Sequence, residues 1–112
     1  MQITELTENQ ISIVAIAGSV DAATAGEITQ YLIDRIHAGK RQIVLDLRQV
    51  DFMSSAGLRA ILVVLKESRS KGGDVYLAGA QPGVENTLKM TGFTGIVKTF
   101  ATVAAAAAEF RN

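Results

Sequence analysis

The chain has 112 residues, of which 48% are hydrophobic and 20% are charged, and its eleven basic residues balance eleven acidic ones. This length and composition indicate a single folded globular domain spanning 1–112, and the zero net charge disfavours binding to nucleic acid or to an anionic membrane. The absence of cysteine excludes a disulfide scaffold, a thiol nucleophile and a cysteine-ligated metal site.

The first third of the chain predicts a hairpin followed by a helix. Segments 2–6 and 10–18 flank a polar turn, which favours two antiparallel strands. Segment 10–18 is nearly continuously apolar and rich in β-branched residues, as is typical of a strand covered on both faces. Asp21 then fits the N-cap of a helix that continues to about His37. The buried stripe of this helix is predicted to comprise Ala25, Ile28, Leu32 and Ile36.

Strand and helix patterns alternate through the rest of the chain. The predicted elements are a strand at 42–47, a helix from Ser54 or Ser55 to about Gly72, a strand at 74–79, a short helix at 84–90, a strand at 95–100 and a final helix at about 102–110. This alternation implies right-handed crossovers and a mostly parallel sheet. Functional sites of such sheets lie beyond the carboxyl ends of the strands, and segment 51–58 lies at such an end.

The sequence lacks the motifs of the common enzyme classes. It contains no glycine-rich nucleotide loop, and its M-S-S-A-G segment does not match the serine-hydrolase pattern G-x-S-x-G. His37 is the only histidine, and its place in the last turn of a predicted helix favours an interaction with the helix dipole over catalysis. One histidine without cysteine does not form a typical zinc site. We therefore predict that the protein is not an enzyme and holds no metal or cofactor.

The segment D-F-M-S-S-A-G-L, residues 51–58, has two interpretations. Serine is a favoured N-cap, so Ser54 or Ser55 can serve only to begin the helix, which is worth about 1 kcal/mol. A cap needs one serine, however, and does not explain Gly57 in the first turn, where glycine costs roughly 0.5–1 kcal/mol relative to alanine. The free N–H groups and the positive dipole of a helix start also suit a phosphate on Ser55, within reach of Arg59 one turn later.

The same helix predicts an exposed surface next to the serines. Its core face is assigned to Leu58, Ile61, Leu62 and Leu65. Val63 then lies nearly opposite the core, beside Arg59, Lys66 and Glu67. A single exposed valine is common in globular proteins, but beside an exposed serine pair it indicates a surface for a protein partner.

Three segments together resemble the STAS domain, and specifically the bacterial anti-sigma factor antagonists. They are GSVDAATAGEI (18–28), IVLDLRQVDFMSSAGLRAIL (43–62) and VYLAGAQPGVENTLKMTGF (75–93), and they occur in the order and spacing of that family. The resemblance implies an α/β fold with a mixed four- to five-stranded β-sheet, an N-terminal antiparallel hairpin and helices mainly on one face.

The resemblance also implies a function. Family members bind an anti-sigma factor that is itself a serine/threonine kinase, and this binding frees a sigma factor. The kinase phosphorylates the antagonist, which then dissociates, and a PP2C-type phosphatase resets it. ATP belongs to the partner in this scheme, so the resemblance implies no cofactor for this chain.

The family's phosphoacceptor segment often reads Asp-Ser-Ser-Gly. Alignment on Gly57 places Ser54 at the aspartate and Ser55 at the modified serine. The acidic neighbour is missing here, which leaves Ser54 as a rival acceptor. Asp21 matches the acidic residue of the family's L-D-A-A-T-A stretch and is expected to cap its helix or to contact the partner. The predicted partner-binding residues are Asp21, Ala22, Met53, Ser54, Ser55, Ala56, Gly57, Arg59 and Val63.

Two other functions stay open on the sequence alone. The fold also suits a non-switching subunit of a stressosome-like scaffold or a lipid-transport complex, or a small-ligand or nucleotide-binding module with its site around residues 19–22 and 53–58. The polar start of the chain lacks the apolar core of a signal peptide, so we expect a cytoplasmic protein. The sequence leaves open whether the apolar edge of the hairpin pairs with a second copy as a weak homodimer.

Overall fold

The computed structural model describes residues 1–112 and begins with the predicted hairpin. β1 (Gln2–Glu8) and β2 (Ile11–Val20) pair in antiparallel orientation. The two turn residues, Asn9 and Gln10, both have positive φ angles, of 50° and 68°. Such a turn matches the twist of the two strands, so the pairing continues to the turn itself and β1 is longer than predicted. β2 is longer than predicted only at its carboxyl end.

The sheet has five strands in the order β1-β2-β3-β4-β5, and every neighbouring pair except β1 and β2 is parallel. β3 (Gln42–Met53) lies at the centre, next to β4 (Asp74–Ala78). β5 comprises only Thr99–Phe100, so the prediction of a strand at 95–100 is wrong for residues 95–98. Phe93–Gly95 instead form a turn of 3-10 helix, η1. It follows Gly92, which has a left-handed backbone conformation that few other residues would adopt.

β2 and β3 continue together past the end of β4, which pairs with β3 only as far as Asp46. Their register shifts after Ala15 and again after Gly18, each time with one extra residue in β3. Such bulges bend a strand and change which side chains face the core. The extension carries the ends of β2 and β3 to the points where the next two helices begin.

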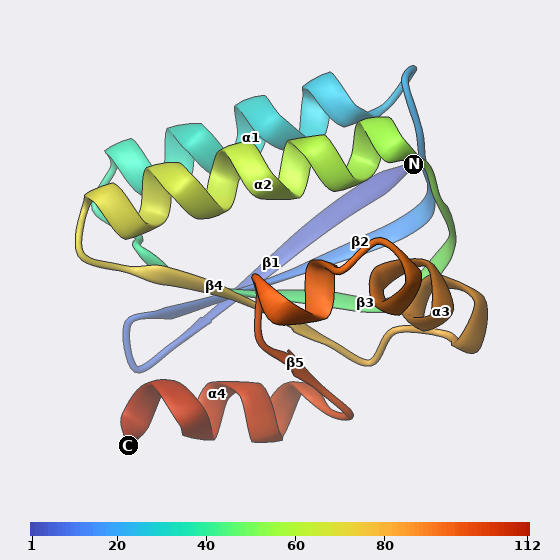
Figure 1. Cartoon of the computed structure of the whole chain (residues 1–112). Helices are drawn as coiled ribbons and strands as arrows, with labels where there is room; N and C mark the ends of the chain where they lie inside the picture. Colours follow the sequence, from blue (N-terminus) through green and yellow to red (C-terminus); the bar gives the residue numbers. More distant parts are fainter.

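Helices cover both faces of the sheet, but mainly one of them (Figure 1). α1 (Ala25–His37) and α2 (Ser55–Ser70) lie side by side on one face, and α3 (Pro82–Met90) packs into the same core. α4 (Val103–Arg111) lies on the opposite face. There the ring of Phe110 stacks on Tyr76 with 4.0 Å between the ring centroids.

The main core lies between the sheet and the α1–α2 pair. The predicted stripe of α1 is buried except for Ala25, which is half buried. The predicted core face of α2 is buried except for Leu62, which is also half buried. The buried members of the two predicted stripes are Ile28, Leu32, Ile36, Leu58, Ile61 and Leu65. On β2, Ser12 is also buried, and its hydroxyl has no hydrogen-bond partner.

Glu5 connects the hairpin to α1. Its Oε1 accepts hydrogen bonds from the hydroxyl of Tyr31 at 2.6 Å and from Nε of Arg35 at 2.8 Å, and Nζ of Lys40 lies 3.4 Å from Oε2. Burial raises the pKa of Glu5, but the hydrogen bond from Tyr31 and the two cations outweigh it, so the pKa is lowered overall. The carboxylate therefore stabilises the fold in its charged form.

Candidate functional site

Ser54 begins α2. Its backbone is extended, and its Oγ accepts a hydrogen bond from the N–H of Gly57 at 3.4 Å. Its own N–H donates to the carbonyl oxygen of Val20 at 2.9 Å, which fixes the start of the helix to the end of β2. Ser54 is thus the N-cap, and of the two roles that the sequence allowed for the serine pair it takes the structural one.

Ser55 is the first residue of α2 and is exposed. Its hydroxyl makes no hydrogen bond within the chain. In the first turn the N–H of Gly57 is bonded to Oγ of Ser54, whereas the N–H groups of Ser55 and Ala56 have no partner inside the helix. The first turn also contains no acidic residue that would compensate the positive end of the helix dipole. The hydroxyl at position 55 is therefore accessible, and the backbone around it favours a negatively charged group.

Gly57 lies inside the structure. A β-carbon at this position would lie 2.5 Å from Sδ of Met53, 2.8 Å from Cγ1 of Val20 and 2.9 Å from the carbonyl oxygen of Val20. Glycine is required because α2 starts directly against the ends of β2 and β3. The structure thereby corrects the prediction that Gly57 and Met53 contact a partner, since Gly57 is buried and Met53 is only 4% exposed.

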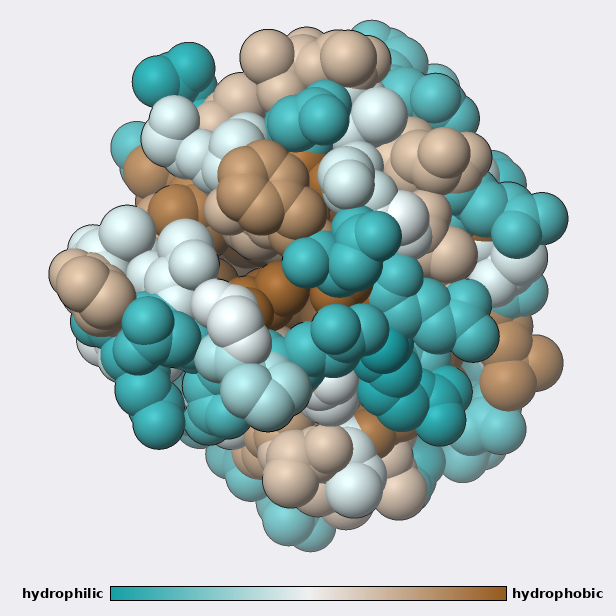
Figure 2. Space-filling model, turned by 90° about the vertical axis from the view of Figure 1, so that its right-hand side faces the viewer, coloured by the Kyte–Doolittle hydropathy of each residue, from teal (hydrophilic) through white to brown (hydrophobic).

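Phe52 takes the exposed place that the sequence had assigned to Met53. Strict alternation from the buried Val50 would bury Phe52 and expose Met53, but the bulge at Asp51 turns the strand, so that Val50 and Met53 both face the core. The side chain of Phe52 is 54% exposed. Figure 2 shows that hydrophobic patches lie between hydrophilic ones on the side of the molecule that it draws.

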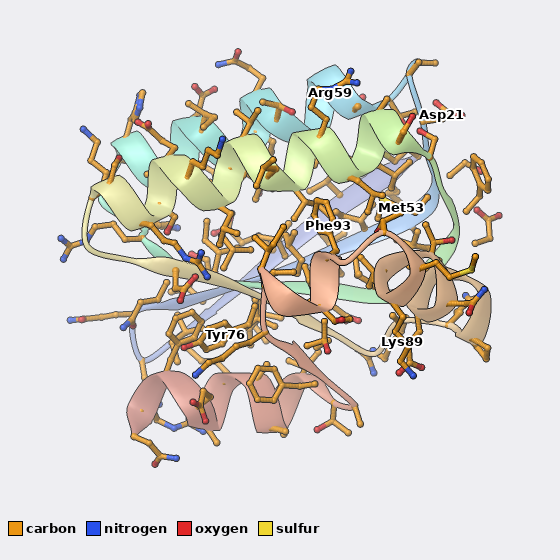
Figure 3. All side chains as sticks on the ribbon, in the orientation of Figure 1. Asp21, Met53, Arg59, Tyr76, Lys89 and Phe93 are labelled. Atoms are coloured by element: carbon orange, nitrogen blue, oxygen red, sulfur yellow. The ribbon has the colours of Figure 1, made fainter.

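Asp21 lies in the loop before α1 and does not cap the helix, so the predicted cap is wrong. The N-cap is Thr24, and Oδ1 of Asp21 instead accepts a hydrogen bond from the N–H of Ala23 at 2.9 Å. Oγ1 of Thr24 accepts from the N–H of Asp21 at 3.0 Å and donates to the carbonyl oxygen of Ser19 at 2.9 Å. The loop is thus held by its own hydrogen bonds, with Ala22 exposed and Asp21 beside the start of α2 (Figure 3).

A shallow groove of about 220 Å³ separates the first halves of α1 and α2. On α2 it is lined by Ala56, Arg59 and Val63, three of the predicted partner-binding residues, together with Ala60. The other side of the groove was not predicted from the sequence, because the periodicity of a helix indicates its buried stripe but not which helix lies next to it. The α1 residues that line the groove are Ala25, Gly26 and Thr29.

A small-ligand cleft, a metal site or a membrane-spanning helix would indicate a different function. The cleft expected for a small ligand around residues 19–22 and 53–58 is absent, and in this region only the shallow groove reaches Ala56. Hollows of about 310 Å³ and 510 Å³ lie elsewhere, beside β5 and around Gly39. No three histidine or carboxylate side chains converge to form a metal site. None of the helices combines the length and apolar character needed to cross a bilayer.

Comparison with known proteins identifies the family. Residues 2–106 match the family model of the STAS domain. The chain belongs to the STAS domain family. BtrV of Bordetella bronchiseptica, a STAS relative designated as an anti-sigma factor antagonist, is 35% identical over 100 residues, which cover 89% of this chain and 86% of BtrV. The anti-sigma F factor antagonist of Paenibacillus polymyxa is 30% identical over 91 residues, which cover 80% and 78% of the two chains.

A solved structure supports the same assignment. A Thermotoga maritima protein that bears the same designation as BtrV superposes on this STAS domain with a TM-score of 0.94 and 25% sequence identity, over 98% of this chain and 95% of the other. The resemblance inferred from three sequence segments is therefore confirmed. So is the predicted fold, a mixed sheet with an antiparallel N-terminal hairpin.

Proposed function

We propose that this STAS domain is an anti-sigma factor antagonist that binds an anti-sigma factor serine/threonine kinase, frees a sigma factor, and dissociates when Ser55 is phosphorylated. The observation that carries the proposal is the exposed, unbonded hydroxyl of Ser55 at the start of α2. Ser54 is a poorer acceptor because it is half buried and its Oγ already caps the helix. The designations of two relatives support the same role.

The helix start can hold the phosphate without rearrangement. A phosphoserine carries about −1.5 to −2 charges at pH 7 and three acceptor oxygens. The free N–H groups at the start of α2 would bind these oxygens, and the exposed side chain of Arg59 lies one helical turn away. The phosphorylated domain is therefore expected to keep its fold.

Phosphorylation would instead act on the complex. A partner that packs against the bare hydroxyl of Ser55 would meet added charge and a tightly bound hydration shell, both of which oppose binding. A penalty of about 4 kcal/mol would weaken binding about a thousandfold. The surface proposed to contact the kinase lies around this hydroxyl and comprises Asp21, Ala22, Phe52, Ser55, Ala56, Arg59 and Val63.

The chain supplies no catalytic residue in this scheme. The kinase would provide ATP and the transfer chemistry, and a PP2C-type phosphatase would remove the phosphate and restore binding. The proposal places the domain in the cytoplasm with these partners. It also accounts for Ser54 and Ser55 together, because one hydroxyl stabilises the helix and the other carries the signal.

The test is phosphorylation by the cognate anti-sigma kinase with ATP, followed by mass spectrometry. One phosphate should be added to the wild-type chain and to Ser54→Ala, and none to Ser55→Ala. Titration calorimetry should show that the phosphorylated chain binds the kinase at least about a hundredfold more weakly. Undiminished modification of Ser55→Ala would refute the assignment of the acceptor. A complex that is indifferent to Ser55→Asp would instead support a non-switching scaffold subunit.

A further inference from the structure

α2 presents a row of exposed side chains on the side away from the sheet. Ser55 begins the row, and the next members follow at steps of four, four and three residues, which place them on one face of a helix. We call this row the α2 stripe. Its members are Ser55, Arg59, Val63 and Lys66, all of them exposed. Figure 3 shows Arg59 on this outer side of the helix pair.

Both cations of the α2 stripe lack an acidic partner. The only carboxylate on α2 is that of Glu67, which pairs with His37 at 2.7 Å. On α1, neither Glu27 nor Asp34 forms an ion pair with the stripe, and Asp34 instead accepts a hydrogen bond from Gln30. Six of the eleven lysines and arginines do pair with a carboxylate within the chain. Those six are Arg35, Lys40, Arg48, Arg69, Lys89 and Lys98.

The uncompensated charge borders an apolar depression. The groove between α1 and α2 has a floor of small side chains, and Arg59 and Val63 form part of its α2 wall. Small residues bring the floor close to the helix backbones, so an apolar side chain of a partner can be inserted between the two helices. The small residues of this lining are Ala25, Gly26, Ala56 and Ala60.

We infer that the α2 stripe docks an acidic amphipathic segment of the anti-sigma factor kinase, with apolar side chains in the groove and carboxylates on Arg59 and Lys66. This inference rests on the proposed function and adds the chemistry of the partner. Charge complementarity argues for this occupant, because a basic or neutral segment would leave both cations unpaired. Opposite charges across a docking surface also raise the association rate.

The same arrangement explains how one phosphate opposes docking. Ser55 lies at the head of the stripe, and its phosphate would bring about −1.5 to −2 charges one helical turn from Arg59. The stripe would change from a net charge of about +2 to nearly zero, and Arg59 would bind the phosphate instead of the partner. The switch would therefore remove an attraction as well as add a steric obstacle.

The experiment measures binding of the unphosphorylated chain to the purified cognate kinase by stopped flow and calorimetry at several salt concentrations. Arg59→Gln and Lys66→Gln are each expected to weaken binding about three- to tenfold, mainly through a slower association that depends less on salt. Lys71→Gln is the matched control, since it removes an exposed, unpaired lysine at the far end of α2. It is expected to bind like the wild type. Circular dichroism verifies that all three variants fold.

The outcomes separate this inference from the proposed function. If Arg59→Gln and Lys66→Gln bind with wild-type affinity and salt dependence while phosphorylation at Ser55 still abolishes the complex, the inference is wrong and the proposed function stands. Tighter binding after either neutralisation would indicate a basic partner and would also overturn the inference. If the kinase neither binds the chain nor modifies Ser55, the proposed function itself fails.

Discussion

Replacement of Gly57 by alanine tests how α2 is placed against the sheet. Alanine is favoured over glycine in a helix by about 0.5–1 kcal/mol. The new β-carbon, however, would lie 2.5 Å from Sδ of Met53 and 2.9 Å from the backbone oxygen of Val20. Overpacking of this kind costs about 1–3 kcal/mol, and here the contacted atoms belong to the buried Met53 and to the backbone of Val20. We therefore expect Gly57→Ala to destabilise the fold by about 1–2 kcal/mol.

Urea denaturation measures this change, and a melting temperature lower by about 4–8 °C should accompany it. Gly26→Ala is the matched control, since Gly26 is also in the first turn of a helix but has no atom within 4 Å of its would-be β-carbon. That variant should gain about 0.5 kcal/mol. If both substitutions stabilise the protein to the same extent, the start of α2 does not depend on the contact of Gly57 with Val20 and Met53.

Three further substitutions test other features. Ser12→Ala removes a buried hydroxyl without a partner and should raise the free energy of unfolding by about 1 kcal/mol in urea titrations; a loss of stability would show that this hydroxyl is satisfied. Because the folded-state pKa of Glu5 is below its ordinary value near 4.5, its charge stabilises the fold above that value, and this stabilisation is lost as the pH falls through the lowered pKa. Glu5→Gln should accordingly lose less stability than the wild type between about pH 7 and about pH 3, and equal losses would contradict the role of its ion pairs. Phe52→Ser should change the free energy of unfolding by less than about 0.5 kcal/mol yet weaken kinase binding; unaltered affinity in calorimetry would exclude Phe52 from the interface.

Much of the fold could be predicted because its signals are local. The continuous apolar run in β2 and the stripe of Ile28, Leu32 and Ile36 in α1 each have the period of their own element. The second half of β3 could not be predicted in this way, since its two bulges interrupt the alternation of buried and exposed residues. The strand at 95–100 was predicted too long. Val97 is buried as a strand residue would be, but it follows the 3-10 turn η1 and lies before β5 begins.

The site was predictable only as a region. The sequence located the serine pair at the start of a helix, but the division of roles depends on the backbone: Ser54 is extended and caps, whereas Ser55 is already helical. The α1 wall of the groove and the exposure of Phe52 arise from tertiary contacts and a bulge, which have no signature within a single element. Asp21 was assigned to the cap for a different reason: a local turn at residues 22–24 separates it from α1, so that Thr24 is the N-cap.

The division of labour between the two serines has a consequence for how this domain can evolve. Position 55 contributes no hydrogen bond to the fold, so a mutation there leaves the native state almost as stable as before. Under the proposed function, replacement of Ser55 by alanine would give a permanently competent antagonist, and replacement by aspartate would give a permanently weakened one. The proposed regulation could thus be lost, fixed or regained at a single residue without a change in the rest of the protein.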